Sequence, residues 1–402
     1  LPFCDTVCFY CACNKVVTKD RSKAAPYLER MHRELALQAE LFAQDRPVEQ
    51  LHWGGGTPTF LSHEEMRTLM QVTGEHFQLL SDDQGEYSIE IDPREADAEG
   101  VALLREIGFN RMSLGVQDFD PRVQKAVNRI QSEEQTLAVL NAARATGFKS
   151  VSIDLIYGLP FQSVDSFATT LDRIIAFGPD RLSVFNYAHL PDLFKPQRRI
   201  NADDLPSPGE KLDILQMCGE KLARAGYVYI GMDHFAKPDD ELARAQRSGT
   251  LYRNFQGYST HAHCDLVGLG ITSIGMVGPS YSQNHKTSDA YAESIDRGEL
   301  PIMRGLTLKR DDLIRRDVIT ALICNFTLDF ADFEQQWQTG FADYFAAELA
   351  NLAGMQEDGL VSVSGQGIEV LPRGRLLIRN ICMVFDAYLQ RDAEKSRFSK
   401  VI

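Results

Sequence analysis

Four cysteines stand close together at the start of this 402-residue chain: Cys4, Cys8, Cys11 and Cys13. The first three have the spacing C-x3-C-x2-C, which lets three thiolates converge on one iron–sulfur cluster from a single short loop. Three protein ligands leave one iron of a four-iron cluster open to a further ligand. The spacing therefore favours a [4Fe–4S] cluster that takes part in chemistry.

A zinc site is the alternative for the same four residues. Structural zinc usually has four closed ligands, commonly supplied by repeated C-x2-C pairs, and this chain has no second such pair. A disulfide framework would spread its cysteines along the chain to close long loops. The crowding of thiols at one end therefore indicates a metal site in a reducing cytosol, with zinc as the competing metal.

A glycine-rich stretch, His52-Trp53-Gly54-Gly55-Gly56-Thr57-Pro58-Thr59, follows a predicted strand. Glycines let the backbone approach a ligand closely. Backbone carbonyls and the Thr57 hydroxyl can accept hydrogen bonds from an ammonium group. The stretch is thus a candidate ligand loop, and a tight strand-to-helix turn is the alternative interpretation.

A third group of candidates lies at or after the ends of the predicted strands: Glu90, Gln117, Arg129, Asp154 and Ala188. Barrel enzymes carry their function at the C-terminal ends of the strands. The two carboxylates can accept hydrogen bonds from a ribose or an amine, and the arginine can clamp a carboxylate. Their recurrence in successive units predicts one shared site.

The elements that would position these residues alternate in type along the chain. Predicted strands lie at residues 50–53, 87–91, 111–116, 150–156, 181–186 and 227–232, and predicted helices at 24–42, 63–77, 98–107, 133–146, 164–177 and 208–225. This rhythm predicts an α/β fold with a parallel sheet or barrel. The pattern changes near residue 305, so we predict two domains, a catalytic barrel at 1–304 and a mainly helical domain at 305–402. In the second, helices are expected at 307–324, 331–338, 341–351 and 374–389, with a hairpin at 359–370.

The charge and composition restrict the partners. The net charge is −14, and apolar residues make up 44% of the chain without an uninterrupted run near membrane-spanning length. Nucleic acid and membrane insertion are therefore not expected, and an acidic substrate would need local Arg or Lys. The run Gln197-Arg198-Arg199 is interpreted as a solvated loop that could meet a substrate carboxylate.

Several stretches together resemble one family. The cysteine spacing is the signature of radical S-adenosylmethionine (SAM) enzymes. The sequences CDTVCFYCACNK, HWGGGTPT, SIEIDPRE, GVQDFD, VNRIQ, IDLIYGLP, FNYAHLP, YRNFQGYSTH and RDDLIRRDVI are similar to those of oxygen-independent coproporphyrinogen III oxidases. The similarity runs from residue 4 to the closing FSKVI, nearly the whole chain. Cys13 and RNFQGY are its more particular features.

The resemblance implies a fold and a reaction. The fold would be an incomplete (β/α)6 TIM-like radical SAM barrel followed by the helical domain. The reaction would be oxidative decarboxylation of two propionates of coproporphyrinogen III to the vinyl groups of protoporphyrinogen IX in haem biosynthesis, through SAM cleavage to a 5′-deoxyadenosyl radical. A haem chaperone with the same barrel and no oxidase activity is the alternative. Cys13 and RNFQGY argue against it. A zinc-stabilised α/β binding protein is the second alternative.

The resemblance also assigns roles to residues. The metal ligands would be Cys4, Cys8 and Cys11. Because three ligands already satisfy a cluster that keeps one iron open, we expect Cys13 to be catalytic, with a small packed thiol as the alternative interpretation. Contacts to a first SAM are implied for Gly55, Glu90, Ala188 and Ile274. Contacts to a second SAM are implied for Tyr10, Gly56, Thr57, Gln117, Arg129 and Asp154.

Partners and location follow from the same resemblance. The expected partners are coproporphyrinogen III, a reduced flavodoxin- or ferredoxin-like electron donor and an unidentified electron acceptor. The protein is expected to be a monomer in the cytoplasm. The family carries a Tyr and a His in a strand before its first cluster cysteine, and this chain begins after them, at Leu1. We therefore expect the first barrel strand to lie upstream.

Overall fold

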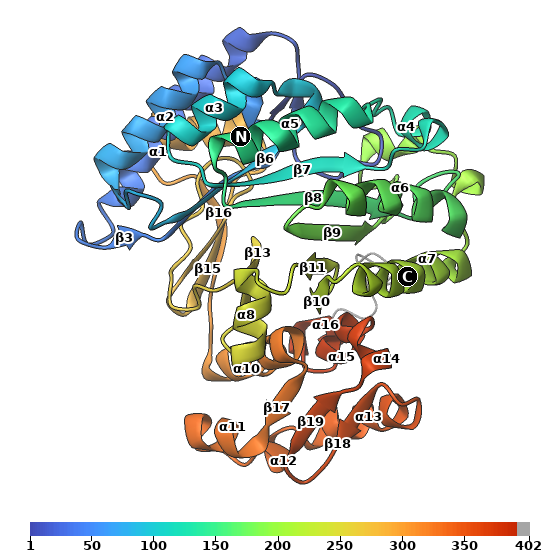
Figure 1. Ribbon diagram of the computed structural model, residues 1–402. Helices are drawn as coiled ribbons and strands as arrows, with labels where there is room; N and C mark the ends of the chain where they lie inside the picture. The colour runs from blue at the N-terminus through green and yellow to red at the C-terminus, as the bar shows by residue number, and fades with distance from the viewer. Residues whose placement is uncertain (392–402) are drawn as a thin grey trace. The chain divides into compact units, whose positions relative to one another are not determined.

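The structure, a computed structural model, describes residues 1–391 (Figure 1). The closing FSKVI stretch lies outside these residues. The chain divides into two compact units: the first comprises Leu1–Ala225 and Cys264–Thr307, and the second comprises Gly226–His263 and the chain from Leu308 onward. The two-domain division at residues 304 and 305 stays a prediction. Within the described part, no helix is both long enough and apolar enough to cross a membrane.

Five parallel strands form the centre of the first unit. They are β4 (Gln50–Trp53), β6 (Glu86–Ile91), β7 (Arg111–Gln117), β8 (Ser150–Tyr157) and β9 (Arg181–Asn186), adjacent in the order β9-β8-β7-β6-β4. Each was predicted to within one residue at either end. Their C-terminal ends meet at one edge, as the predicted site requires.

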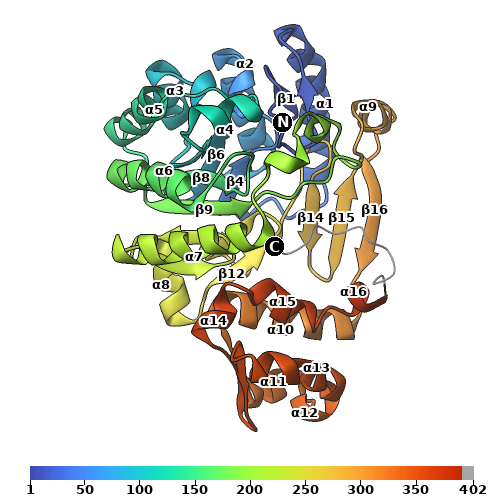
Figure 2. The ribbon, with the colours of Figure 1, turned by 90° about the vertical axis from the view of Figure 1, so that its right-hand side faces the viewer.

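Helices α3 (Ala98–Glu106), α5 (Glu133–Thr146) and α6 (Val164–Phe177) lie outside these strands (Figure 2). The connections also carry α1 (Ala24–Ala39), α2 (His63–His76), α4 (Pro121–Ala126) and α7 (Pro208–Arg224). Capping boxes at Ser62, Ser132, Ser163 and Ser207 fix four helix starts, because each serine accepts a bond from an otherwise unpaired backbone N–H. The sequence therefore sets these boundaries locally.

The strands have one deeply buried face and one more open face. On β7, Met112, Leu114 and Val116 are buried, whereas Ser113 and Gly115 between them are only partly buried. This alternation, repeated on β6 and β8, places apolar side chains toward the helices and polar ones toward the interior. The open face is thus the lining of the predicted site.

An antiparallel sheet completes the first unit and was not predicted. It consists of β14 (Ile274–Val277), β15 (Ser280–Asn284) and β16 (Ile302–Thr307), with α9 (Ser288–Asp296) between the last two. The buried carboxylate of Glu34 on α1 ties this region down, because it accepts hydrogen bonds from Gly270 N (2.8 Å), Asn284 Nδ2 (2.7 Å) and Tyr291 Oη (2.6 Å).

The second unit is built around phenylalanines, with Phe330, Phe333, Phe341, Phe345 and Phe385 in one buried cluster. Its elements are β10 (Val228–Gly231), β11 (His234–Ala236), α8 (Glu241–Ser248), β12 (Tyr252–Asn254), β13 (Gly257–Ser259), α10 (Arg310–Asn325), β17 (Thr327–Asp329), α11 (Phe330–Trp337), α12 (Phe341–Tyr344), α13 (Ala346–Glu357), β18 (Val361–Val363) and β19 (Gly367–Val370). The predicted hairpin is confirmed by the antiparallel pairing of β18 with β19.

Two helix predictions for this unit were wrong in their continuity. The segment predicted as one helix at 341–351 is α12 and α13, separated where Phe345 leaves helical geometry (φ −109°, ψ 28°). The last predicted helix is three short ones, α14 (Pro372–Arg375), α15 (Ile378–Met383) and α16 (Ala387–Arg391). Leu377 (φ −107°, ψ 20°) separates the first two. Apolar periodicity continues through such breaks and does not reveal them.

Candidate active site

The residues from Cys4 to Lys15, called here the cluster loop, run between two short parallel strands. Strand β1 (Phe3–Cys4) enters the loop and β2 (Val16–Val17) leaves it, with Cys4 opposite Val17. The two residues after helix α4 hold the loop from one side: Phe9 N donates to Val127 O (2.9 Å), and Asn128 Nδ2 donates to Val7 O (2.8 Å). The loop is therefore fixed against the segment that follows β7.

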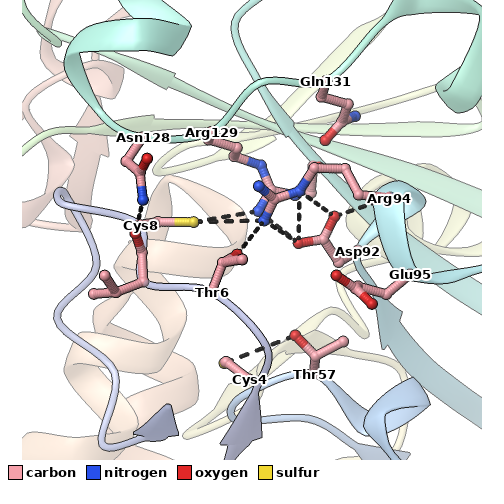
Figure 3. Close-up of polar contacts among 12 residues, drawn as sticks. Cys4, Thr6, Cys8, Thr57, Asp92, Arg94, Glu95, Asn128, Arg129 and Gln131 are labelled. Carbon is pink, nitrogen blue, oxygen red and sulfur yellow. Dashed lines mark hydrogen bonds and ion pairs between the residues drawn. The ribbon is translucent and has the colours of Figure 1, made fainter. Parts of the chain in front are cut away.

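Two of the three predicted ligand sulfurs meet donors from the glycine stretch and from the loop itself. The Thr57 hydroxyl donates to Cys4 Sγ at 3.7 Å, and Cys13 N donates to Cys11 Sγ at 3.4 Å (Figure 3 shows the first). Burial raises the pKa of Cys4 to about 11. The hydrogen bond with Cys13 lowers the pKa of Cys11 to about 5. The surroundings of Cys11 thus favour its thiolate form.

The third sulfur, Cys8 Sγ, is buried beside two guanidinium groups. Arg129 Nη1 lies 3.6 Å from it and Arg94 Nη2 lies 3.7 Å from it (Figure 3). Asp92 pairs with both arginines, at 2.9 Å and 2.6 Å. Two cations next to one sulfur would stabilise the negative charge of an anionic cluster bound there.

The spacing of the sulfurs is unsuited to one zinc ion. No three of the sulfurs of Cys4, Cys8, Cys11 and Cys13, all in the described part of the chain, lie within 4.8 Å of one another. Zn–S bonds of about 2.3 Å in a tetrahedron bring the sulfurs to about 3.8 Å. A four-iron cluster uses a different iron for each cysteine, so it fits this wider arrangement better.

The glycine stretch is a close-approach segment as well as a turn. A Cβ on Gly56 would lie 2.5 Å from the Phe3 carbonyl oxygen, so only glycine fits there. Next to it, Thr57 N donates to that same carbonyl at 2.7 Å. Gly55 is exposed, has a φ of 113° and donates its N–H to Glu90 Oε2 at 3.0 Å. Gly55 is thus the member of the stretch best placed to meet a ligand.

The open face of the strands carries two predicted carboxylates. Burial opposes ionisation of Glu90, but hydrogen bonds from His52 and from Gly55 N lower its pKa. Asp154 accepts a hydrogen bond from Ser113 Oγ at 2.7 Å, and burial raises the pKa of Asp154 to about 6. Glu90 and Ser113 are register partners on adjacent strands. The structure therefore brings both carboxylates into one polar layer.

Gln117 and Arg129 leave buried polar atoms unsatisfied. Gln117 has a φ of 72°, and both its Oε1 and the Nε of Arg129 lack hydrogen-bond partners within the part of the chain described. A Cβ on Gly115 would lie 2.9 Å from Gln117 Nε2 and 3.2 Å from Arg129 Nη2, so the glycine makes room for both. Orphaned buried groups of this kind indicate a missing ligand. With the donors around the sulfurs, they fit a cluster and an adjoining polar cofactor.

Gln197 corrects one interpretation of the sequence. It is only 1% exposed rather than solvated. Its Nε2 donates to the carbonyls of Tyr10 (2.9 Å) and Ala188 (3.1 Å), and its Oε1 accepts from Leu190 N (2.6 Å). It therefore joins the cluster loop to the segment after β9, and so links two of the predicted SAM-contacting residues.

The remaining predicted residues lie at the margin of this network. Cys13 is exposed, unlike the other three cysteines of the loop. Ile274 is the first residue of β14, opposite Gln283. The cluster loop reaches this sheet region through Asn14 Nδ2, which donates to Lys286 O at 2.5 Å.

Sequence reasoning missed Asp92, Arg94, Asn128 and Gln197 as residues that hold the cluster loop. The first three stand in SIEIDPRE and VNRIQ, stretches that were already noted. Arg94 and Asn128 contact the loop 86 and 121 positions away in the chain, and Asp92 acts through its ion pairs with Arg94 and Arg129. No local pattern could assign these roles.

Comparison with known proteins agrees with this geometry. Residues 1–174 match the radical SAM superfamily, and residues 308–377 match the HemN C-terminal domain. An oxygen-independent coproporphyrinogen III oxidase of Pseudomonas aeruginosa is 57% identical over all of this chain and 87% of its own length. The protein of that name from Escherichia coli K12 is 54% identical with the same coverage.

One solved structure matches over almost the whole chain. It is the structure of coproporphyrinogen III oxidase (HemN) from Escherichia coli, a radical SAM enzyme, with a TM-score of 0.94 and 54% identity over 97% of this chain and 89% of its own.

The parallel α/β fold and the three-cysteine loop define a radical SAM enzyme, so the predicted fold class is confirmed. A [4Fe–4S] cluster and SAM are its cofactors. Within that class, the chain belongs to the oxygen-independent coproporphyrinogen III oxidase family. The resemblance stated from the sequence is thus confirmed, and the haem-chaperone alternative is not favoured.

Proposed function

We propose that the chain converts two propionate side chains of coproporphyrinogen III into the vinyl groups of protoporphyrinogen IX, with loss of two CO2. The carrying observation is that each of Cys4, Cys8 and Cys11 faces a hydrogen-bond donor, in a chain that belongs to this family over its full length. When bound, the cluster and SAM would supply, with one electron from the reduced donor, a 5′-deoxyadenosyl radical that can take a hydrogen atom from the propionate β-carbon. Loss of CO2 and of one electron to an acceptor would then leave the vinyl group.

The three cysteines would hold the cluster, and the polar layer beside them would hold SAM. Gly55, Glu90, Ala188 and Ile274 are proposed for a first SAM. Glu90 supports this role because it stays ionised next to the Gly55 N–H, where it can accept bonds from an amine.

A second SAM is proposed at Tyr10, Gly56, Thr57, Gln117, Arg129 and Asp154. The unsatisfied atoms of Gln117 and Arg129 support this part of the proposal. Gly56 would contribute only its backbone, since the Phe3 carbonyl occupies its side-chain direction. Asp154, with a pKa near 6, can accept a hydrogen bond from a ribose hydroxyl when ionised.

Cys13 is proposed as the catalytic thiol. It is exposed where the other loop cysteines are not, and its hydrogen bond with Cys11 raises its pKa, so it keeps its proton. The Glu90 carboxylate also raises the pKa of Cys13. A protonated thiol there can assist hydrogen or electron transfer during turnover.

The remaining partners complete the proposal. Electrons would come from a reduced flavodoxin- or ferredoxin-like protein and leave to a separate acceptor. The protein would act as a monomer in the cytoplasm, where the eight free thiols of the chain stay reduced.

The test is anaerobic reconstitution with iron and sulfide, followed by assay with SAM, a reductant and coproporphyrinogen III. The wild type should become brown and form protoporphyrinogen IX. Cys8→Ala should lose the colour, SAM cleavage and product together, whereas Cys264→Ala, a cysteine outside the loop, should retain all three. A colourless zinc protein, or a brown one that binds haem and forms no product, would contradict the proposal.

A further inference from the structure

A short cationic turn lies immediately beside the cluster loop. It is the 3-10 turn Lys195–Arg199, which follows β9 and the segment around Ala188. Gln197, at its centre, is bonded to the Tyr10 and Ala188 carbonyls. Because both donor bonds come from one buried amide, the turn is held in register with the cluster loop at the C-terminal end of the strands.

The two arginines of this turn, Arg198 and Arg199, are exposed, in contrast to the buried Gln197. The guanidinium of Arg199 lies 5.1 Å from the ring centre of Phe9, between Cys8 and Tyr10 in the loop. The Nε of Arg198 donates a hydrogen bond to the Pro191 carbonyl at 2.9 Å, which leaves the two terminal nitrogens of the guanidinium available. Stacking on an aromatic ring likewise leaves the N–H edge of a guanidinium free to bind an anion.

None of the three cations of the turn is neutralised by contact. Over the residues that the structure covers, Lys195, Arg198 and Arg199 form no ion pair within 4.0 Å. Asp192, Asp203 and Asp204 stand nearby in the sequence without pairing with them. By contrast, Arg94 and Arg129, deeper in the site, are both paired with Asp92. In a chain of net charge −14, unpaired arginines beside the site attract an anionic ligand.

We propose that Arg198 and Arg199 bind carboxylates of the substrate, at propionates that are not reacting. The inference rests on the proposed function, whose substrate carries four propionates, of which two react. A guanidinium binds a carboxylate through paired N–H bonds. Because Gln197 holds the turn in place, a substrate bound in this way would be held in one orientation. The turn would thereby fix which propionate faces the cofactor.

The test measures binding of coproporphyrin III, the oxidised fluorescent analogue with the same four carboxylates, to the reconstituted holoenzyme. Arg199→Gln and Arg198→Gln should each weaken binding about tenfold, as expected for loss of one charge-assisted bond, and the double variant more. Arg199→Lys should be intermediate, because it keeps the charge without the fork. With coproporphyrinogen III, KM should rise more than kcat falls.

Lys149→Gln is the matched control. It removes one positive charge at the opposite end of the strands, just before β8, and should bind coproporphyrin III as the wild type does. The tetramethyl ester of coproporphyrin III should bind wild type and Arg199→Gln equally. Iron content and SAM cleavage without substrate should match the wild type in every variant, which verifies folding.

Unchanged coproporphyrin III binding by the double variant would overturn the inference, as would an equal loss of ester binding. These outcomes are separable from failure of the proposed function. If the proposed function were wrong, the wild type itself would form no protoporphyrinogen IX, whatever the arginine variants bind.

Discussion

Arg129 Nη1 lies 3.6 Å from Cys8 Sγ, although the two residues are 121 positions apart in the chain. The same guanidinium pairs with Asp92 at 2.9 Å and donates to the Gly115 carbonyl at 2.5 Å. One side chain thus connects a cluster cysteine with the ends of β6 and β7. The cluster loop and the polar layer are therefore a single structural unit.

Removing the charge of Arg129 should alter the cluster itself. A positive charge next to a ligand sulfur favours the reduced, more negative cluster. Arg129→Gln should therefore lower the reduction potential, on the order of 60 mV if about 1.4 kcal/mol is lost for one electron. An anaerobic redox titration followed by EPR measures this shift. Lys149→Gln should show no shift, and an unchanged potential in Arg129→Gln would argue against the contact.

Cys13→Ser should separate cluster assembly from turnover. Three cysteines already hold the cluster, so iron content and absorbance should stay close to those of the wild type, while protoporphyrinogen IX formation falls sharply. Iron analysis and product assay on the same sample provide both numbers. If Cys13→Ser loses its cluster, the thiol is a ligand or supports Cys11 through their hydrogen bond, and the catalytic role is wrong.

Gln197→Leu should destabilise the site because it leaves three partly buried backbone groups, at Tyr10, Ala188 and Leu190, without their partner. Each unsatisfied group costs about 1–3 kcal/mol, partly relieved by relaxation, so the melting temperature should fall by several degrees. SAM affinity of the reconstituted protein should fall as well. The neighbouring exposed Arg198→Gln should leave both close to wild type. Equal losses in the two variants would show that Gln197 has no special anchoring role.

The pH dependence of stability should contain a contribution from Asp154. Its pKa is raised by burial to about 6 from an ordinary value of 3.8, so the folded state binds a proton more tightly than the unfolded state. The stabilisation is complete below about pH 4 and is lost as pH rises through 6. The loss is at most ~3 kcal/mol for a shift of about two units.

Asp154→Asn isolates this contribution, because Asn keeps an oxygen for the Ser113 hydroxyl but does not titrate. Between about pH 4 and pH 7, the variant should gain stability relative to the wild type. Urea unfolding of the apo proteins at several pH values measures the difference. If the free energies of unfolding of the two proteins changed with pH in parallel, Asp154 would titrate normally.

The sequence supports the prediction of elements better than that of their connections. The strands β4, β6, β7, β8 and β9 were predictable because each is a short apolar run ended by polar residues or glycine, and the capped helix starts are local signals. The β14–β16 sheet was not, because strands such as Ser280–Asn284 are mostly polar and lack a clean alternation. A buried glutamate, Glu34, holds that sheet from α1 instead.

The candidate site shows the same limit. The cysteine triplet and the glycine stretch are short contiguous patterns, and the structure brings both together at Thr57 and Cys4. Gln197 looked like part of a solvated loop because two arginines follow it. Its burial depends on carbonyls at Tyr10 and Ala188 that no local pattern could connect with it.

The most direct test of the central claim follows one hydrogen atom. Coproporphyrinogen III deuterated at the propionate β-carbons is incubated anaerobically with the reconstituted protein, SAM and a reductant, and the 5′-deoxyadenosine formed is analysed by mass spectrometry. The account predicts 5′-deoxyadenosine that carries one deuterium, together with protoporphyrinogen IX. Unlabelled 5′-deoxyadenosine, formed while the labelled substrate is converted, would contradict it.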